Sequence, residues 1–391
     1  MGFLLARSGV RVTVLETHAD FLRDFRGDTI HPSTFEVMRQ VGLLDEVLAV
    51  TDFRASTLSL NFEGHSLRGP DFSHLDVTCP FIGFAPQWDL LNLVAEEAKR
   101  LPTFRLRMST RATGVVREGG RVVGVRCEAR GGSEEVIACD LAVAADGRGS
   151  TLRESAQNEV IEEGVPIDAL WFRLDRPAGD DGHTLAWLRN GHMLVTIPRR
   201  THYQIAMVVR KGAFPEIQSR GLPAFRETVS TVCPPLADVA GSLSGWEDVK
   251  LLTVQINRLA RWHEPGLLFI GDAAHAMSPM GGVGINLAVQ DAVAAANALW
   301  QPLRNGSVTE EDLRRVQVRR EPPTVRTQSL QRKAHETLFG RSRGADQAYD
   351  ISLGSKIAVR VLLPLLRRRL GHIIGMGFQP ESVESPARVE N

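Results

Sequence analysis

The stretch GDAAHAMSPMGGVGINLAVQD, residues 271–291, decides how the whole sequence is interpreted. Apolar residues 267–270 before it predict a buried strand, and Ala-rich residues 285–300 predict a long helix. This order places Asp272 at the carboxyl edge of an α/β sheet, where ligands bind. The glycines let the backbone approach a flat ring system, and the helix start offers N–H groups. The alternative interpretation is a simple strand-to-helix turn that is capped by the aspartate. We favour ligand binding, because such a turn requires neither the histidine nor the glycines.

A second stretch, CDLAVAADGRGSTLR, lies upstream and has a related pattern. Residues 141–145 predict a buried strand that ends in Asp146-Gly147, and Arg148 follows at the head of a short helix. Considered alone, this pattern also fits a polar turn after a strand. Its combination with the first stretch makes the ligand-binding interpretation much more specific.

The N-terminal segment has the pattern of the second half of a dinucleotide-binding βαβ unit. Residues 3–9 predict the end of a helix that stops at Gly9, and residues 10–16 alternate like a strand that ends in Glu16. An acid there accepts hydrogen bonds from ribose hydroxyls, although strand ends at the surface also often carry charge. We expect the first strand and its pyrophosphate-binding GxGxxG loop upstream of Met1, with a shortened product as the alternative.

Together these three motifs resemble the FAD-dependent monooxygenases of the para-hydroxybenzoate hydroxylase type, over residues 1–300. The resemblance implies that Glu16 holds the adenosine ribose and that Asp272 binds the ribityl chain. It also implies that the loop around Pro279 lines the isoalloxazine through backbone groups. The residues that it assigns to cofactor binding are Glu16, Arg26, Arg39, Gln87, Asp146, Gly147, Arg148, Gly271, Asp272, Pro279, Gly281, Gly282, Gly284, Ile285 and Asn286.

Some of these assignments have a simple alternative. Arg26 and Arg39 match arginines that lie near the flavin or its pyrophosphate in this family, and Gln87 matches a polar residue that contacts the flavin. The alternative for each of these three side chains is a solvated polar residue. Asp146 and Gly147 match the motif that serves both FAD and the nicotinamide cofactor.

The expected fold class is α/β, with a Rossmann-like FAD/NAD(P)-binding domain, an inserted and mostly antiparallel β-sheet substrate domain, and a helical C-terminal region. Short alternating segments between residues 165 and 256 predict the sheet. We assign residues 1–55, 85–160 and 263–300 to the FAD-binding domain, 56–84 and 161–262 to the substrate-binding sheet, and 301–391 to C-terminal helices and a polar tail.

The resemblance implies that NADPH or NADH reduces FAD and that dioxygen then forms a flavin C4a-hydroperoxide. This species would hydroxylate or epoxidise an aromatic or polyketide-like small molecule, with no side chain as nucleophile. A flavin halogenase is one rival, although the nearest match to its WxWxIP motif, residues 195–198, lacks the tryptophans. The other rivals are a flavin-dependent reductase or dehydrogenase and a truncated remnant without FAD.

The histidines and cysteines give no metal-binding pattern. We interpret His275 as a structural residue that hydrogen-bonds its loop, with a catalytic base as the alternative. His192 and His202 could face a ligand or solvent. The histidines lack HxxxH spacing and the four cysteines include no CxxC pair, which argues against a metal site and a disulfide framework.

Composition gives the expectations for partners and location. The 46 basic and 46 acidic residues balance, so nothing points to nucleic acid. No apolar run reaches the ~18 residues of a membrane-spanning helix. We therefore expect a cytoplasmic enzyme, monomeric or homodimeric, that binds dioxygen and a small aromatic or hydrophobic substrate.

The C-terminal residues 356–378 combine leucines and valines with arginines. One interpretation is an amphipathic helix that makes weak contact with a membrane. We favour the other, a helix that packs its apolar face on the domain and is broken by Pro364.

Overall fold

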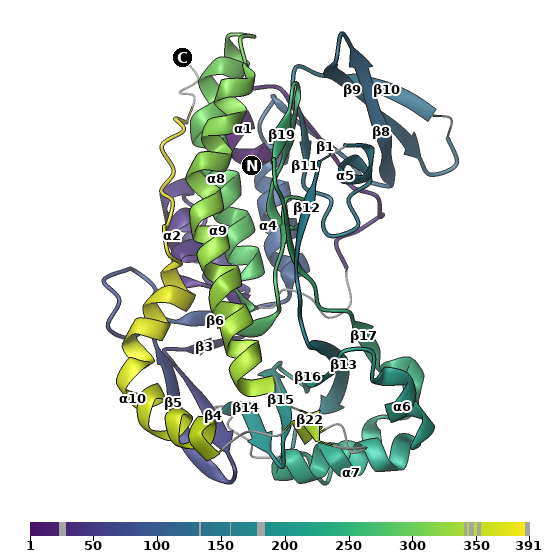
Figure 1. Cartoon of the computed structure of the whole chain (residues 1–391). Coiled ribbons are helices and arrows are strands. Elements are labelled where there is room, and N and C mark those ends of the chain that lie inside the picture. The colour runs from purple at the N-terminus through teal and green to yellow at the C-terminus, as the bar shows by residue number, and fades with distance from the viewer. Residues whose placement is uncertain are drawn as a thin grey trace.

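A computed structural model of the chain is shown in Figure 1. It describes residues 1–22, 29–132, 134–156, 158–177, 184–339, 342–343, 348–349 and 353–387.

Two pairs of parallel strands form the nucleotide-binding half. Strand β1 (Val12–Leu15) pairs with β7 (Phe104–Arg107), and β11 (Ala142–Ala144) pairs with β20 (Leu267–Phe269). Because parallel strands end at one edge, the segments that follow β11 and β20 meet, and Ile270 N donates to Ala144 O at 3.1 Å. Among the described strands, β1 and β11 each have one hydrogen-bonded neighbour. The strand expected upstream of Met1 stays a prediction.

Helices cover this half because their apolar faces pack on one another. Helix α2 (Pro32–Val41) begins with the predicted proline and ends at Gly42, which has a left-handed φ of 79°. Its apolar side, including the fully buried Phe35, packs with residues of α1 (Gly2–Arg7), α4 (Gln87–Lys99) and α8 (Gly284–Arg304). The predicted helix after the glycine loop is confirmed as α8.

The predicted antiparallel sheet is confirmed. Its strands are, in spatial order, β17 (Lys250–Leu252), β13 (Ile167–Asp175), β16 (His202–Arg210), β15 (His192–Pro198), β14 (Thr184–Arg189), β4 (Thr57–Phe62) and β5 (His65–Asp71). All neighbours are antiparallel except β14 and β4. Helices α6 (Phe214–Ser219) and α7 (Leu222–Val232) pack at this sheet, and the sequence analysis did not predict them.

The remaining elements connect these parts. The helices are α3 (Leu44–Ala49), α5 (Thr151–Ser155) and the short 3-10 helices η1 (Pro234–Leu236), η2 (Ala240–Ser242), η3 (Trp246–Asp248), η4 (Gly271–Ala273) and η5 (Met280–Gly282). The strands are β2 (Thr29–Ile30), β3 (Phe53–Ala55), β6 (Ile82–Phe84), β8 (Thr110–Glu118), β9 (Arg121–Ala129), β10 (Glu134–Ala138), β12 (Val160–Glu163), β18 (Ile256–Leu259), β19 (His263–Glu264), β21 (His275–Ala276), β22 (Ser342–Arg343) and β23 (Ala348–Tyr349).

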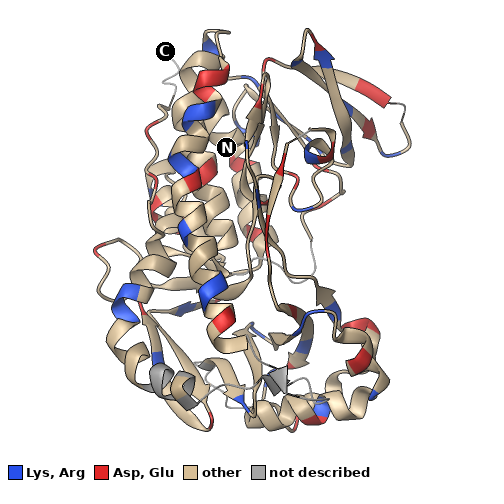
Figure 2. Cartoon of the chain, in the orientation of Figure 1, with Lys and Arg blue, Asp and Glu red and all other residues tan. Residues whose placement is uncertain are grey.

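Helix α9 (Glu310–Phe339) runs beside α8 from the nucleotide-binding half down to the sheet (Figure 1). Figure 2 shows charged residues of both signs along it, and ion pairs such as Arg314 with Glu311 and Arg332 with Glu336 lie on its exposed side. Its opposite side is buried and largely polar, and includes Arg320, Gln328 and His335. This helix therefore presents polar groups to the protein interior.

The predicted break at Pro364 is wrong, because α10 (Leu353–Met376) continues through it. Pro364 removes one N–H donor, but it lies on an exposed part of the helix, where water can satisfy the carbonyl that loses its partner. Among the described side chains of α10, the packing interpretation holds for the C-terminal half, where Gly371 meets β5. Four apolar side chains of the preceding turns are 42% to 75% exposed, namely Val361, Leu362, Leu365 and Leu366.

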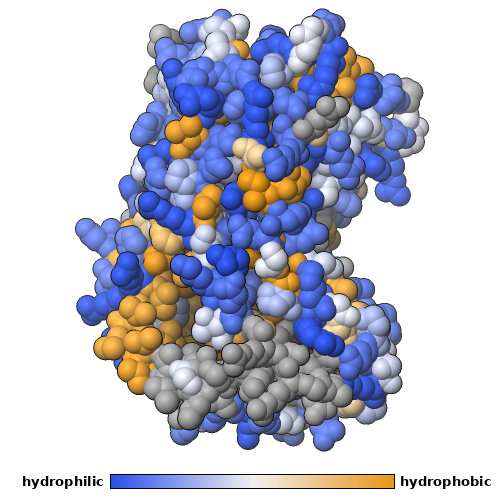
Figure 3. Space-filling view, viewed as in Figure 1, coloured by the Kyte–Doolittle hydropathy of each residue, from blue (hydrophilic) through white to orange (hydrophobic). Residues whose placement is uncertain are grey.

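Figure 3 shows orange, apolar surface over the region where Figure 1 places α10. None of the described helices combines the length and the apolar character needed to cross a bilayer.

We predict that Gly371→Ala destabilises the protein. An added Cβ would lie 1.9 Å from the carbonyl oxygen of Asp71 in β5, so the α10–β5 contact must open. Overpacking of this kind costs about 1–3 kcal/mol, whereas Gly→Ala inside a helix otherwise stabilises by about 1 kcal/mol. Urea unfolding measures the sign, with the exposed neighbour His372→Ala as control. Unchanged or increased stability of Gly371→Ala would contradict this packing.

Candidate functional site

The first and second motifs meet at the carboxyl edge of the parallel strands. Arg148, which follows β11, donates from Nε to Asp272 Oδ2 at 3.0 Å and from Nη2 to Met277 O at 2.6 Å. The side chain of Asp272 is 34% exposed, so the carboxylate remains accessible. Nη1 of Arg148 is buried without a partner among the described residues. The ion pair therefore joins two segments that lie far apart in the sequence. The exposed part of the Asp272 carboxylate and Nη1 of Arg148 remain for further hydrogen bonds.

Asp291 lies fully buried in α8 and organises the turn that carries Asp272. Its Oδ2 accepts from Gly271 N at 3.1 Å and from His275 Nε2 at 2.6 Å, and its Oδ1 accepts from Arg320 Nε at 3.0 Å. Burial raises the pKa of Asp291, but His275 and Arg320 outweigh burial and hold this pKa below its usual value. The carboxylate thus stays charged and fixes the backbone of the turn.

The contacts of His275 favour the structural interpretation. Its side chain is 1% exposed, its ring packs on Trp262 at 4.8 Å between centroids, and Nε2 bonds to Asp291. A carboxylate can only accept, so Nε2 carries the proton. This buried ring has no access to a substrate proton.

The glycine loop leads into the uncapped start of α8. Gly281 and Gly282 have φ values of 82° and 65°, which side chains other than glycine rarely adopt. No side chain caps the first turn of α8, and a Cβ added at Gly284 would meet nothing within 4 Å. The helix therefore starts without a side-chain cap, beside open space at Gly284.

Helix α9 holds the preceding part of the loop through three buried side chains. Gln328 Nε2 donates to Asn257 O at 2.9 Å and to Ala276 O at 3.0 Å. Gln331 and His335, one turn apart, both contact Ser278.

His31 holds the other end of the loop. Its Nε2 lies 3.0 Å from Gly282 O, and its Nδ1 lies 2.7 Å from Ile374 O in α10. Burial lowers the pKa of His31, against the effect of these two carbonyls. His31, Gln331 and His335 were not among the predicted residues, because an isolated polar residue gives no signal in the sequence that it is buried.

Other residues predicted at the cofactor lie in several places. Glu16 ends β1 and accepts from His18 N at 2.9 Å, and Asp146 is exposed after β11. Gln87 is half-buried at the start of α4. Arg39 pairs with Glu36 on the surface of α2, with 49% of its side chain exposed.

Four further positions belong to the predicted cofactor site. The side chain of Asn286 is turned to α2, since Ser33 Oγ and Thr34 Oγ1 lie 2.6 and 3.0 Å from its Oδ1. Ile285 is half-buried in the first turn of α8, and Gly147 has a φ of 81°. Arg26 lies outside the described residues.

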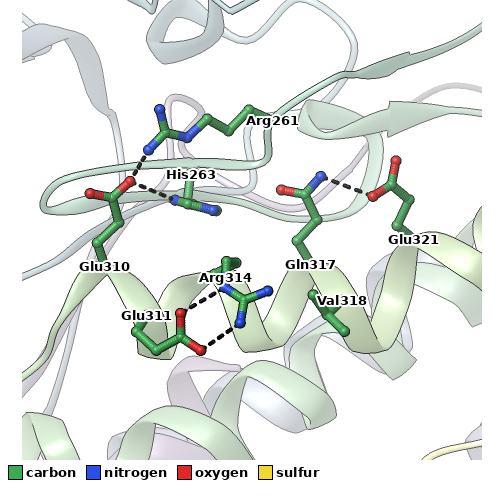
Figure 4. Close-up of a pocket in the computed structure, with 8 residues that line it drawn as sticks. All are labelled: Arg261, His263, Glu310, Glu311, Arg314, Gln317, Val318 and Glu321. Carbon is green, nitrogen blue, oxygen red and sulfur yellow. Dashed lines mark hydrogen bonds and ion pairs between the residues drawn. The ribbon is translucent and has the colours of Figure 1, made fainter.

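A surface pocket of about 590 Å³ lies between α9 and the segment around β19 (Figure 4). Its lining is mostly charged, and Figure 4 shows Glu310 facing Arg261 and Glu311 facing Arg314. None of the residues predicted at the cofactor lines it. Within the part of the chain that is described, no group of three or more His, Cys, Asp or Glu could hold a metal ion.

Comparison with known proteins identifies the family. The sequence model of the family described as FAD binding domain matches residues 1–324. The chain belongs to this family. The 6-methylpretetramide 4-monooxygenase of Streptomyces rimosus is 32% identical over 343 residues, which cover 85% of this chain and 79% of that enzyme. The chain is thus an FAD-dependent monooxygenase, as the sequence motifs predict.

Solved structures support the fold. PqsL, a probable FAD-dependent monooxygenase from Pseudomonas aeruginosa, has a TM-score of 0.73 and 24% identity, covering 86% of this chain and 92% of that one. The myxobacterial chondrochloren halogenase CndH has a TM-score of 0.74 and 18% identity, covering 98% and 91%. At these identities the two structures establish the fold alone.

The residues of this FAD-dependent monooxygenase fit its cofactor. Asp272 is an accessible carboxylate that can accept from ribityl hydroxyls, and the N–H groups at the start of α8 suit the polar edge of a flavin ring. Added Cβ atoms at Gly147 and Gly284 would enter open space, so the backbone can approach a ligand closely at both places.

We predict that stability falls as the pH is lowered from 7 to about 4, in part through His335. Burial lowers the pKa of His335 from 6.5 to about 4, so in this window the unfolded chain binds a proton that the folded protein does not. The slope from one proton is at most about 1.4 kcal/mol per pH unit. Urea unfolding across this range should give a shallower dependence for His335→Gln, which stays neutral. Equal slopes for the two proteins would contradict the assignment.

Proposed function

We propose that this monooxygenase takes electrons from NADPH or NADH and inserts one oxygen atom from dioxygen into an aromatic or polyketide-like small molecule. The support that carries most weight is the 32% identity to an enzyme named as a monooxygenase of 6-methylpretetramide. FAD, when bound, supplies the chemistry by accepting a hydride and activating dioxygen. The protein binds and orients the reactants and excludes water.

Each part of the site has a proposed role in this scheme. Asp272 accepts hydrogen bonds from the ribityl chain, and Arg148 orients its carboxylate through the 3.0 Å ion pair. The backbone at Pro279, Gly281 and the start of α8 lines the ring and stabilises negative charge on it. Glu16 holds the adenosine ribose in this proposal.

The substrate lies, in this proposal, between the loop and the antiparallel sheet. Met280 of the loop belongs to the same apolar cluster as Met193 of β15 and Val208 of β16. An apolar boundary of this kind suits an aromatic or hydrophobic ligand. Burial lowers the pKa of His202 at the start of β16, and Arg173 lowers it further, so this imidazole is neutral at pH 7.

The proposal includes a cytoplasmic location, a monomer or homodimer, and weak membrane contact by the exposed apolar residues of α10. The likeness to CndH does not favour halogenation, because it shows the fold alone and residues 195–198 lack the paired tryptophans of a halogenase.

Asp272→Ala should raise the FAD dissociation constant about 10- to 100-fold, because charge-assisted hydrogen bonds of about 1.5–3 kcal/mol are lost. The fluorescence of FAD titrated with apoprotein measures the constant. The exposed Asp238→Ala serves as control and should match the wild type. Wild-type affinity in Asp272→Ala would remove the ribityl assignment.

The activity is tested with polycyclic phenols, NADPH and ¹⁸O-labelled dioxygen. Mass spectrometry should find one labelled oxygen atom per product molecule, with equal consumption of NADPH and dioxygen. A reduced product that carries no labelled oxygen would identify a reductase instead. Purified protein that binds no flavin when it is titrated with FAD would identify a remnant.

A further inference from the structure

The loop segment 278–280 is held by the side-chain amide of Gln331, which makes the hydrogen bonds that a neighbouring strand would otherwise make. Gln331 Oε1 accepts from Ser278 N at 3.1 Å, and Gln331 Nε2 donates to Ser278 O at 3.0 Å and to Met280 O at 2.9 Å. The carboxamide thus pairs with both backbone groups of Ser278, as a neighbouring strand would. Gln331 is 4% exposed and Ser278 is 1% exposed, so water cannot replace these bonds.

His335 adds a second hold on Ser278. Its Nε2 lies 3.0 Å from Ser278 Oγ, and this oxygen also accepts from Met280 N at 3.2 Å. The hydroxyl is thus hydrogen-bonded both to the imidazole and to the backbone of its own loop. Backbone and side chain of one loop residue are therefore both fixed by α9.

The held segment lies directly before the residues that must meet the flavin. Pro279, Gly281 and Gly282 follow Ser278, and two of them adopt left-handed φ values that leave the loop few alternative paths. His31 holds Gly282 O at the far end. The loop is thus fixed on both sides of its most curved part.

We propose that Gln331 is a positioning residue for FAD, which sets the backbone at 278–280 so that the N–H groups at the start of α8 meet the isoalloxazine. This inference rests on the proposed binding of the ring at this loop. Gln331 and His335 lie beyond residues 1–324, the part of the chain that matches the FAD binding domain family. The loop therefore depends on side chains outside the family region.

The test is Gln331→Met, which keeps the side-chain volume and removes all three hydrogen bonds. Arg226→Met is the control, because Arg226 of α7 holds a backbone segment away from the loop, through hydrogen bonds from its Nε and Nη2 to Leu243 O. For each variant we would measure melting temperature, the absorption spectrum of bound FAD, its dissociation constant and its midpoint potential.

Both variants should melt at lower temperature, but only Gln331→Met should change the flavin. Displaced N–H groups stabilise reduced FAD less, so its affinity should fall about tenfold more than that of oxidised FAD. For a two-electron couple this lowers the midpoint potential by about 30 mV. Gln331→Glu should have a larger effect than Gln331→Met, since its carboxylate faces two carbonyl oxygens.

An unchanged spectrum and potential in Gln331→Met, with only the melting temperature lowered as in Arg226→Met, would overturn the inference. If Gln331→Met does not fold, Gln331→Asn, whose side chain is one methylene shorter and withdraws the carboxamide from Ser278 and Met280, carries the same test. Asp272→Ala separates this result from the proposed function. If Asp272→Ala weakens FAD binding while Gln331→Met leaves the flavin unchanged, the positioning role alone fails.

Discussion

The structure depends on the buried ion pair between Asp291 of α8 and Arg320 of α9. Both side chains are fully buried, and Arg320 also donates to Glu381 and to Gln290. A buried pair stabilises only when its remaining hydrogen bonds are made, and those of Asp291 are made by the turn that carries the flavin motif. Asp291 can hold Gly271 and His275 as a carboxylate because Arg320 balances its charge.

From this pair the support extends in two directions. Along α9, polar side chains reach the loop as far as Ser278, so one helix fixes both ends of the segment between β20 and the glycines. Towards the C-terminus, Glu381 accepts from Arg319 and Arg320, and the tail continues to Ser8, whose Oγ donates to Pro386 O at 2.8 Å. The candidate cofactor site is thus built by the FAD motif together with segments that carry no motif.

The parallel strands, α2 and α8 could be predicted because apolar periodicity and glycine stops are local properties of the sequence. Helix α7 has a comparable signal, with buried Phe225, Val229 and Val232 at helical spacing, and was overlooked. The role of α9 could not be predicted, because its buried side is polar and periodicity of apolar residues cannot reveal it. In the same way, the turn of Asn286 towards α2 depends on partners that are distant in the sequence.

The most direct test of this account is the stability of Arg320→Met, measured by urea unfolding of the FAD-saturated protein. Arg319→Met is the control, since Arg319 also pairs with Glu381 but is 49% exposed. Removing one partner of a buried pair should lower the free energy of unfolding by about 3–5 kcal/mol, against about 1 kcal/mol or less for an exposed pair. FAD should bind more weakly to Arg320→Met than to the wild type, whereas its affinity for Arg319→Met should be unchanged. Equal small losses in both variants, with unchanged FAD affinity, would contradict the central role of the ion pair.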